Sequence, residues 1–129
     1  MTRTLSTPQQ RALRTTFGPE SFEILIEAVA DQAYPLSLAL PVGYILLNVT
    51  TELASGTCTV NVQKVVAGTP ASVTNLSAIS ATATQLESTP TDDGTNVFAA
   101  GDGLQFTASA NAAGVDLSIT IAMQRITGN

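Results

Sequence analysis

Few side chains in this sequence belong to the types that carry out catalysis. The 129 residues include no histidine, which is the commonest general base and the usual partner of a nucleophilic serine or cysteine. The single cysteine, Cys58, lies in an alternating apolar run with no activating neighbour in sequence. We therefore interpret it as a small buried hydrophobe. The Cys/His sets of zinc sites and the glycine-rich loop of phosphate sites are also absent from the sequence.

Three carboxylates in predicted loops are the remaining candidates for chemistry. Asp92, Asp93 and Asp102 could meet at one end of the molecule and hold calcium or act as a carboxylate pair. However, aspartate beside glycine is ordinary turn chemistry, and no spaced set of oxygen ligands accompanies it. We expect turn residues here, with no catalytic residue, no metal site and no cofactor. The chain is thus predicted not to be an enzyme, and a carboxylate-only hydrolase is the alternative.

The aromatic residues provide little support for sugar binding. Carbohydrate-binding modules usually present an exposed aromatic platform, whereas Phe22 and Phe106 fall on predicted core positions and tryptophan is absent. Tyr34 and Tyr44 are the two candidates left in the predicted body for contact with an external partner.

Alternation of apolar and polar residues predicts a chain built from strands. Residues 104–110 and 115–125 have period two, and residues 111–114 are predicted to join them as a hairpin. Residues 43–53 and 57–66 form a second predicted hairpin around Ala54-Ser55-Gly56. Residues 21–30 favour a strand over a helix, and residues 33–40 an edge strand. Weaker strands are predicted at 71–76, 81–87 and 95–99.

These eight or nine short strands predict an all-β fold, an antiparallel β-sandwich that is jelly-roll-like, over residues 20–129. Residues 1–19 form a predicted N-terminal arm. Within it, residues 8–16 have the capping pattern of a short helix, with proline at the first helical position and Gly18-Pro19 to end it. A helix this short needs a surface to pack on.

Charge is unevenly distributed between the arm and the body. The arm carries Arg3, Arg11 and Arg14 and no acid, so its charge is +3; the other two basic residues and ten acids give the rest −8 and the chain −5. A body of this sign repels nucleic acid, so we expect none as a partner. The basic arm either lies on an acidic protein surface or is a solvated terminus. We expect no membrane partner, because the most apolar stretch is too short and is interrupted by proline and glycine.

The surface is predicted to be poor in charge. Charged residues make up 12% of the chain and apolar residues 44%, whereas about a quarter of an average domain is charged. Because surface charge normally opposes association, this composition favours an obligate assembly. A robust monomer rich in alanine and threonine is the alternative.

Four segments together resemble a known class of proteins. They are residues 43–50 (GYILLNVT), 57–63 (TCTVNVQ), 97–107 (VFAAGDGLQFT) and 116–125 (DLSITIAMQR). This part of the chain, roughly residues 40–126, resembles small virion structural proteins of tailed bacteriophages, in particular jelly-roll capsid decoration (cement) proteins and the globular ends of head or tail fibres.

The resemblance implies a structural role on the outer surface of the virion, after assembly in the host cytoplasm. Its implied partners are the major capsid protein and the chain itself, as a homotrimer at local threefold positions. Arg3, Arg11, Arg14, Phe17, Tyr34 and Tyr44 are the candidate partner-binding residues. A receptor- or glycan-binding fibre tip, or a tail accessory protein, is the alternative function.

Overall fold

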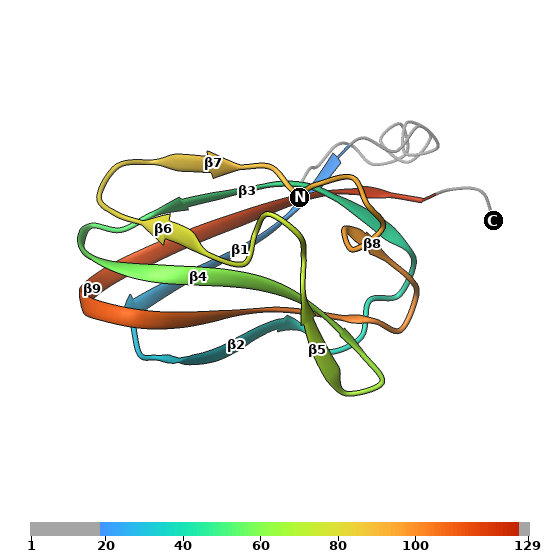
Figure 1. Cartoon of the computed structure of the whole chain (residues 1–129), viewed down its shortest axis with the longest axis horizontal. Coiled ribbons are helices and arrows are strands. Elements are labelled where there is room, and N and C mark those ends of the chain that lie inside the picture. The colour runs from blue at the N-terminus through green and yellow to red at the C-terminus, as the bar shows by residue number, and fades with distance from the viewer. Residues whose placement is uncertain (1–18, 127–129) are drawn as a thin grey trace, which may run out of the picture.

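A computed structural model describes residues 19–126, which contain nine strands and no helix (Figure 1). All strand pairs are antiparallel. The strands are β1 (Pro19–Ala28), β2 (Gln32–Ser37), β3 (Tyr44–Glu52), β4 (Ser55–Val66), β5 (Thr69–Ser72), β6 (Ile79–Ala81), β7 (Leu86–Ser88), β8 (Val97–Phe98) and β9 (Gly103–Arg125).

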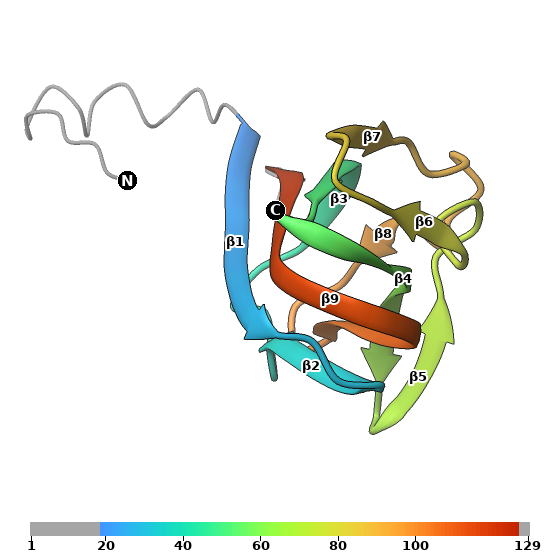
Figure 2. The same cartoon turned by 90° about the vertical axis from the view of Figure 1, so that its left-hand side faces the viewer.

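The long strand β9 is the spine of the sheet. Its first half pairs with β2 on one side and β4 on the other. Its second half pairs with β1 and β3. The short strands extend these pairs, since β5 and β6 add to β4 while β7 and β8 add to β3. Figure 2 shows that β9 bends where its two halves meet, so that the sheet curls.

The bend in β9 replaces the hairpin predicted around residues 111–114. Ala110, Ala113 and Asp116 have positive φ angles of 49°, 55° and 53°. Twice in this region β9 advances three residues while β4 advances two, so each step holds one extra residue as a β-bulge. The chain therefore turns sharply but continues in one strand, and the prediction of two strands paired with each other is wrong.

The side chain of Asn111 stabilises this bend. Its amide donates a hydrogen bond to the Val29 carbonyl (2.8 Å), and its carbonyl accepts one from the Gly114 amide (2.9 Å). The backbone amide of Asn111 donates to the Asp31 carboxylate (3.0 Å). Polar groups that the bulges remove from the ladder are thus bonded to the β1–β2 connection.

The predicted hairpin of β3 and β4 is also wrong. The two strands do not pair with each other, because β3 joins the second half of β9 and β4 the first half. Gly56, at a φ of 81°, lies directly against the bend, where an added Cβ would overlap the Ala113 carbonyl and lie 2.7 Å from the Ala112 oxygen. The turn therefore carries the chain across the curled sheet.

A bulge in β3 changes which side chains of that strand are buried. Tyr44 and Leu46 face the core, the register then shifts between Leu46 and Asn48, and Val49 and Thr51 are the next buried residues. A strict two-residue period would have kept Tyr44 and Val49 on opposite faces. The bulge therefore explains why the apolar residues of this segment do not follow a single two-residue alternation.

Among the described strands, β4 and the following strand β5 form a hairpin. Val66 pairs with Thr69, and both loop residues, Ala67 and Gly68, have positive φ angles of 52° and 82°. This is the pattern of a two-residue type I′ turn.

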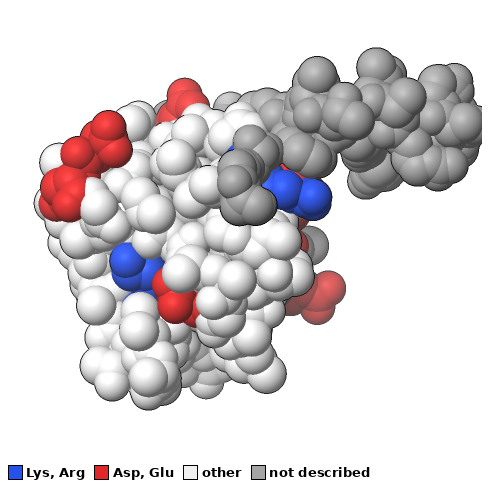
Figure 3. Space-filling view, turned by 90° about the vertical axis from the view of Figure 1, so that its right-hand side faces the viewer, with Lys and Arg blue, Asp and Glu red and all other residues white. Residues whose placement is uncertain are grey.

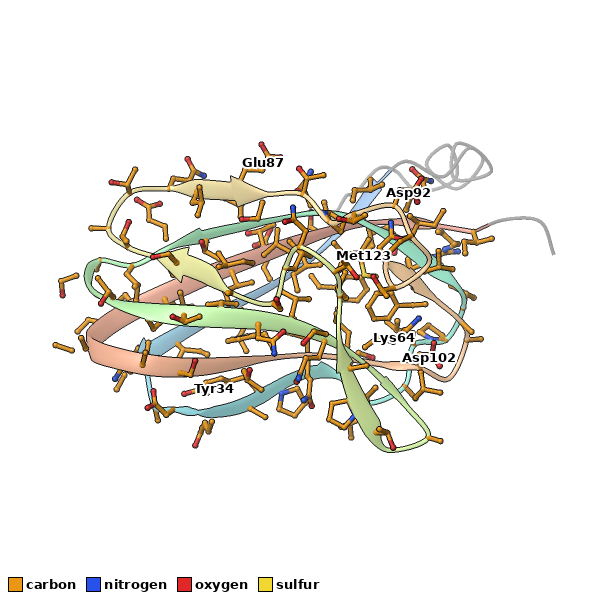
Figure 4. All side chains as sticks on the ribbon, viewed as in Figure 1. Tyr34, Lys64, Glu87, Asp92, Asp102 and Met123 are labelled. Atoms are coloured by element: carbon orange, nitrogen blue, oxygen red, sulfur yellow. The ribbon has the colours of Figure 1, made fainter. Side chains whose placement is uncertain are left out.

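One core fills the curled sheet. Alternate residues of β9, including Phe106, Leu117, Ile119, Ile121 and Met123, are almost fully buried, as the period predicts, and Met123 lies in the interior (Figure 4). The all-β, antiparallel prediction is confirmed, as are the strand at residues 21–30 and the edge strand near residues 33–40. The predicted arm helix lies outside the described residues.

We predict that Gly56→Ala is strongly destabilising. Alanine at a positive φ costs about 1–2 kcal/mol by itself, and the overlap with the Ala113 backbone requires a further shift of the bend. We expect a loss of at least about 3 kcal/mol in the free energy of unfolding, measured by urea titration at fixed protein concentration.

Gly68→Ala is the matched control, because Gly68 has nearly the same φ but nothing within 4 Å of an added Cβ. Gly68→Ala should lower the free energy of unfolding only by the conformational cost of alanine at a positive φ, about 1–2 kcal/mol. An equal loss in the free energy of unfolding for Gly56→Ala and Gly68→Ala would show that close packing at the bend does not contribute to stability.

Candidate partner-binding surface

Only two of the predicted partner-binding residues fall within the described part of the chain. Tyr34 lies on β2 and Tyr44 begins β3. Arg3, Arg11, Arg14 and Phe17 lie outside the described residues.

Tyr44 is buried, which corrects the expectation that it is available to an external partner. Only 3% of it is exposed, and its ring packs edge-on against Phe22 at a centroid distance of 5.6 Å. Its hydroxyl donates to Glu20 Oε1 (3.0 Å), while Glu20 Oε2 lies 3.1 Å from Arg125 Nη2. The bulge in β3 is the physical reason, because it allows Tyr44 and Val49 to face the same core.

Tyr34 is half-buried and has most of its contacts inside the fold. Its ring stacks on Phe106 at 5.2 Å with an interplanar angle of 24°. Its hydroxyl accepts a hydrogen bond from the Ala30 amide (2.9 Å) and donates one to the Ala30 carbonyl (3.2 Å). These contacts fix the ring against β9 and the β1–β2 connection, rather than leaving it as an open platform.

Two of the three loop aspartates, Asp93 and Asp102, are engaged in turns, as predicted. Asp93 Oδ1 accepts hydrogen bonds from the Thr95 amide (3.0 Å) and hydroxyl (2.6 Å), and these bonds lower the pKa of Asp93. Asp102 Oδ2 accepts one from the Ala99 amide (2.8 Å). Among residues 19–126 no three His, Cys, Asp or Glu side chains are grouped as metal ligands would be.

Cys58 is buried at 3% exposure in β4, opposite Ala81 of β6. Burial raises the pKa of its thiol, with a smaller contribution from the charge of Asp31. A raised pKa keeps the sulfur protonated, the opposite of what an activated nucleophile requires.

The outer face of β1 and β9 has a shallow open depression of about 310 Å³, lined by Glu23, Ile24, Leu25, Ser118, Ile119 and Thr120. It combines one carboxylate with two hydroxyls.

No helix within residues 19–126 is both long and apolar enough to cross a membrane.

Sequence reasoning missed a set of exposed apolar residues at one end of the sheet, which we call the apolar end. Its members are Leu38, Val66, Val97 and Ile126, with exposed fractions of 85%, 48%, 38% and 40%. They come from four different connections and strand ends, so no periodic pattern connects them in sequence. Figure 3 shows this side of the molecule as a largely uncharged surface with a few charged groups.

We predict that Tyr44→Phe lowers stability at neutral pH by about 1 kcal/mol, because it removes a hydrogen bond to a carboxylate. Burial, followed by the hydrogen bond and charge of Glu20, raises the pKa of Tyr44. For a group whose pKa is raised on folding, the stabilisation is complete below the unfolded pKa of about 10 and is lost as the pH rises through the folded value.

Urea titrations at pH 8 and pH 11 measure this difference. The wild type should lose more stability between these pH values than Tyr44→Phe, whereas Tyr34→Phe serves as the control for removing a hydroxyl elsewhere. Parallel pH curves for the wild type and Tyr44→Phe would contradict the prediction.

Comparison with known proteins provides a weak structural likeness. No protein-family model and no curated protein matches the sequence. Among solved structures, the fold is similar to a chain of the "Cyanophage Pam1 capsid asymmetric unit", with a TM-score of 0.45 and 18% identity over 84% of both chains. We base no functional conclusion on a likeness of this size.

Proposed function

We propose that this chain is a non-enzymatic structural protein of a tailed-phage virion, specifically a decoration protein that binds the outer capsid surface as a trimer. The observation that carries the proposal is the apolar end, an exposed apolar surface on a body that is poor in charge. The assignment to a virion is supported by the resemblance of residues 40–126 to decoration proteins.

The sheet offers edges through which copies of the chain could associate. Within the described residues, β1 and β2 pair with β9 alone, so each has an open edge. An unpaired edge presents backbone donors and acceptors to a neighbour. Together with the scarcity of surface charge, these edges support self-association into the proposed trimer.

The pairing also supports a jelly-roll-like sandwich as the finer description of the fold. The two halves of β9 belong to two groups of strands, β2 with β4 and β1 with β3, that lie on either side of the bend. Such a body would bind an assembled shell by extended contact and stabilise it by mass action.

Sedimentation velocity tests the trimer. We expect one species with about three times the chain mass of 13.3 kDa at micromolar concentration. A species of the monomer mass at tens of micromolar would contradict the trimer.

Co-sedimentation with shells of the proposed capsid partner tests the virion role. The variant in which Arg3, Arg11 and Arg14 are replaced by Gln should bind at least about tenfold more weakly, because three charge-assisted contacts are lost.

The matched control replaces three exposed acids of the body, Glu23, Glu27 and Glu87, by Gln, and should retain binding. Equal binding by both triple variants would exclude a contribution of the arm charges. Failure of the wild type to co-sediment would overturn the decoration role.

A further inference from the structure

The apolar end contains four of the seven large hydrophobic residues that are exposed within residues 19–126. A single exposed leucine or valine is ordinary, whereas a group of them indicates a surface that is covered in use. The occupant must be able to contact apolar side chains and must come close to this end.

Backbone contacts establish that the four residues share one end of the sheet. A Cβ at Gly103 would lie 3.1 Å from both the Leu38 carbonyl and Val65 Cβ, next to Val66. Lys64 Nζ donates to the Val97 carbonyl (2.8 Å), and the Ile126 amide donates to the Gly43 carbonyl (2.9 Å). A Cβ added at Gly43 would in turn lie 3.2 Å from the carbonyl oxygen of Phe98, which follows Val97.

Acidic groups accompany this apolar surface. Figure 4 places Asp92 and Asp102 at the same end as Lys64, and Asp93 follows Asp92. The Lys64 ammonium is held by the Val97 carbonyl and lies 5.8 Å from the centre of the Phe98 ring. The one ion pair shown within residues 19–126 joins Arg125 to Glu20, so none of the three aspartates is in an ion pair there.

Residues 1–18 are chemically suited to this surface. They carry Arg3, Arg11 and Arg14 without an acid, and Leu13 and Phe17 are four residues apart, a spacing that places two side chains on one side of a helix. The segment joins the body at the same end, since Pro19 pairs with Gln124, two residues before Ile126. Eighteen extended residues span about 60 Å, which is long enough to reach from Pro19 across the apolar end.

We propose that the apolar end is an intrachain docking surface for residues 1–18 in the free protein. Leu13 and Phe17 cover Leu38 and its apolar neighbours, and the arginines lie beside Asp92, Asp93 and Asp102. A short tether gives a high effective concentration, so the segment of the same chain outcompetes that of another copy. This inference concerns the protein before it binds any shell and is independent of the decoration role.

Limited trypsin digestion of the full chain tests the docking. Trypsin cleaves after Lys and Arg, and three of the five such residues lie in the segment, while Lys64 and Arg125 lie in strands. Cleavage after Arg11 and Arg14, followed by mass spectrometry, should be at least about fivefold slower than in a synthetic peptide of residues 1–18. Added salt should reduce this protection.

Two pairs of variants identify the surface. Leu38→Ser should raise the cleavage rate toward that of the peptide, whereas Leu25→Ser, on the outer face of β1, should leave it unchanged; both residues are exposed, at 85% and 57%. Asp92→Asn with Asp93→Asn should also raise the rate, and Glu23→Gln with Glu27→Gln should not.

Three outcomes would overturn the proposal. The first is cleavage of the wild type at the peptide rate. The second is an equal effect of Leu38→Ser and Leu25→Ser. The third is protection that increases with protein concentration, which would assign the surface to the segment of a neighbouring copy. Circular dichroism of each variant verifies that the body stays folded.

Discussion

The fold depends on a single constraint, which is that one strand must belong to both halves of the sheet. Strand β9 can do this only because its backbone bends without leaving the ladder, through two bulges and three residues at positive φ. Alanine and aspartate rarely adopt that conformation, so the surroundings must compensate for its cost. The compensation comes from the bonds of Asn111 and from Gly56, whose missing Cβ allows β4 to start directly against the bend.

The polar groups that might have suggested chemistry are used to hold this structure together. The Tyr44 hydroxyl, Glu20 and Arg125 form a connected set that ties the start of β1 to the start of β3 and the end of β9. Tyr34 links β2 to the connection that precedes it, and Asp93 and Asp102 each close a loop by accepting a hydrogen bond from a backbone amide. Each of these groups is bonded within the chain, so each contributes to the stability of the fold.

Contact over a surface is also the physical basis of the proposed function. A body with few charges, open strand edges and an apolar end is poorly protected against association, whereas a binding protein of this kind needs large and complementary surfaces. The proposed docking of residues 1–18 would reduce unwanted association of the free protein. A basic segment with apolar side chains would cover the apolar end until a larger partner replaces it.

The sequence alone determined the strand content and most of the core. The alternation in residues 115–125 predicted one apolar face made of Val115, Leu117, Ile119, Ile121 and Met123. All of these except Val115, which is 40% exposed beside the bend, are buried, because a two-residue period depends only on local geometry. Which strands pair with each other was decided only by the tertiary structure. Both predicted hairpins were wrong, since the Ala54-Ser55-Gly56 and Asn111-Ala112-Ala113-Gly114 segments have turn residues that look the same in sequence whether the chain reverses or crosses over. The burial of Tyr44 and the apolar end follow from a bulge and from the meeting of distant connections, which only the packed chain brings together.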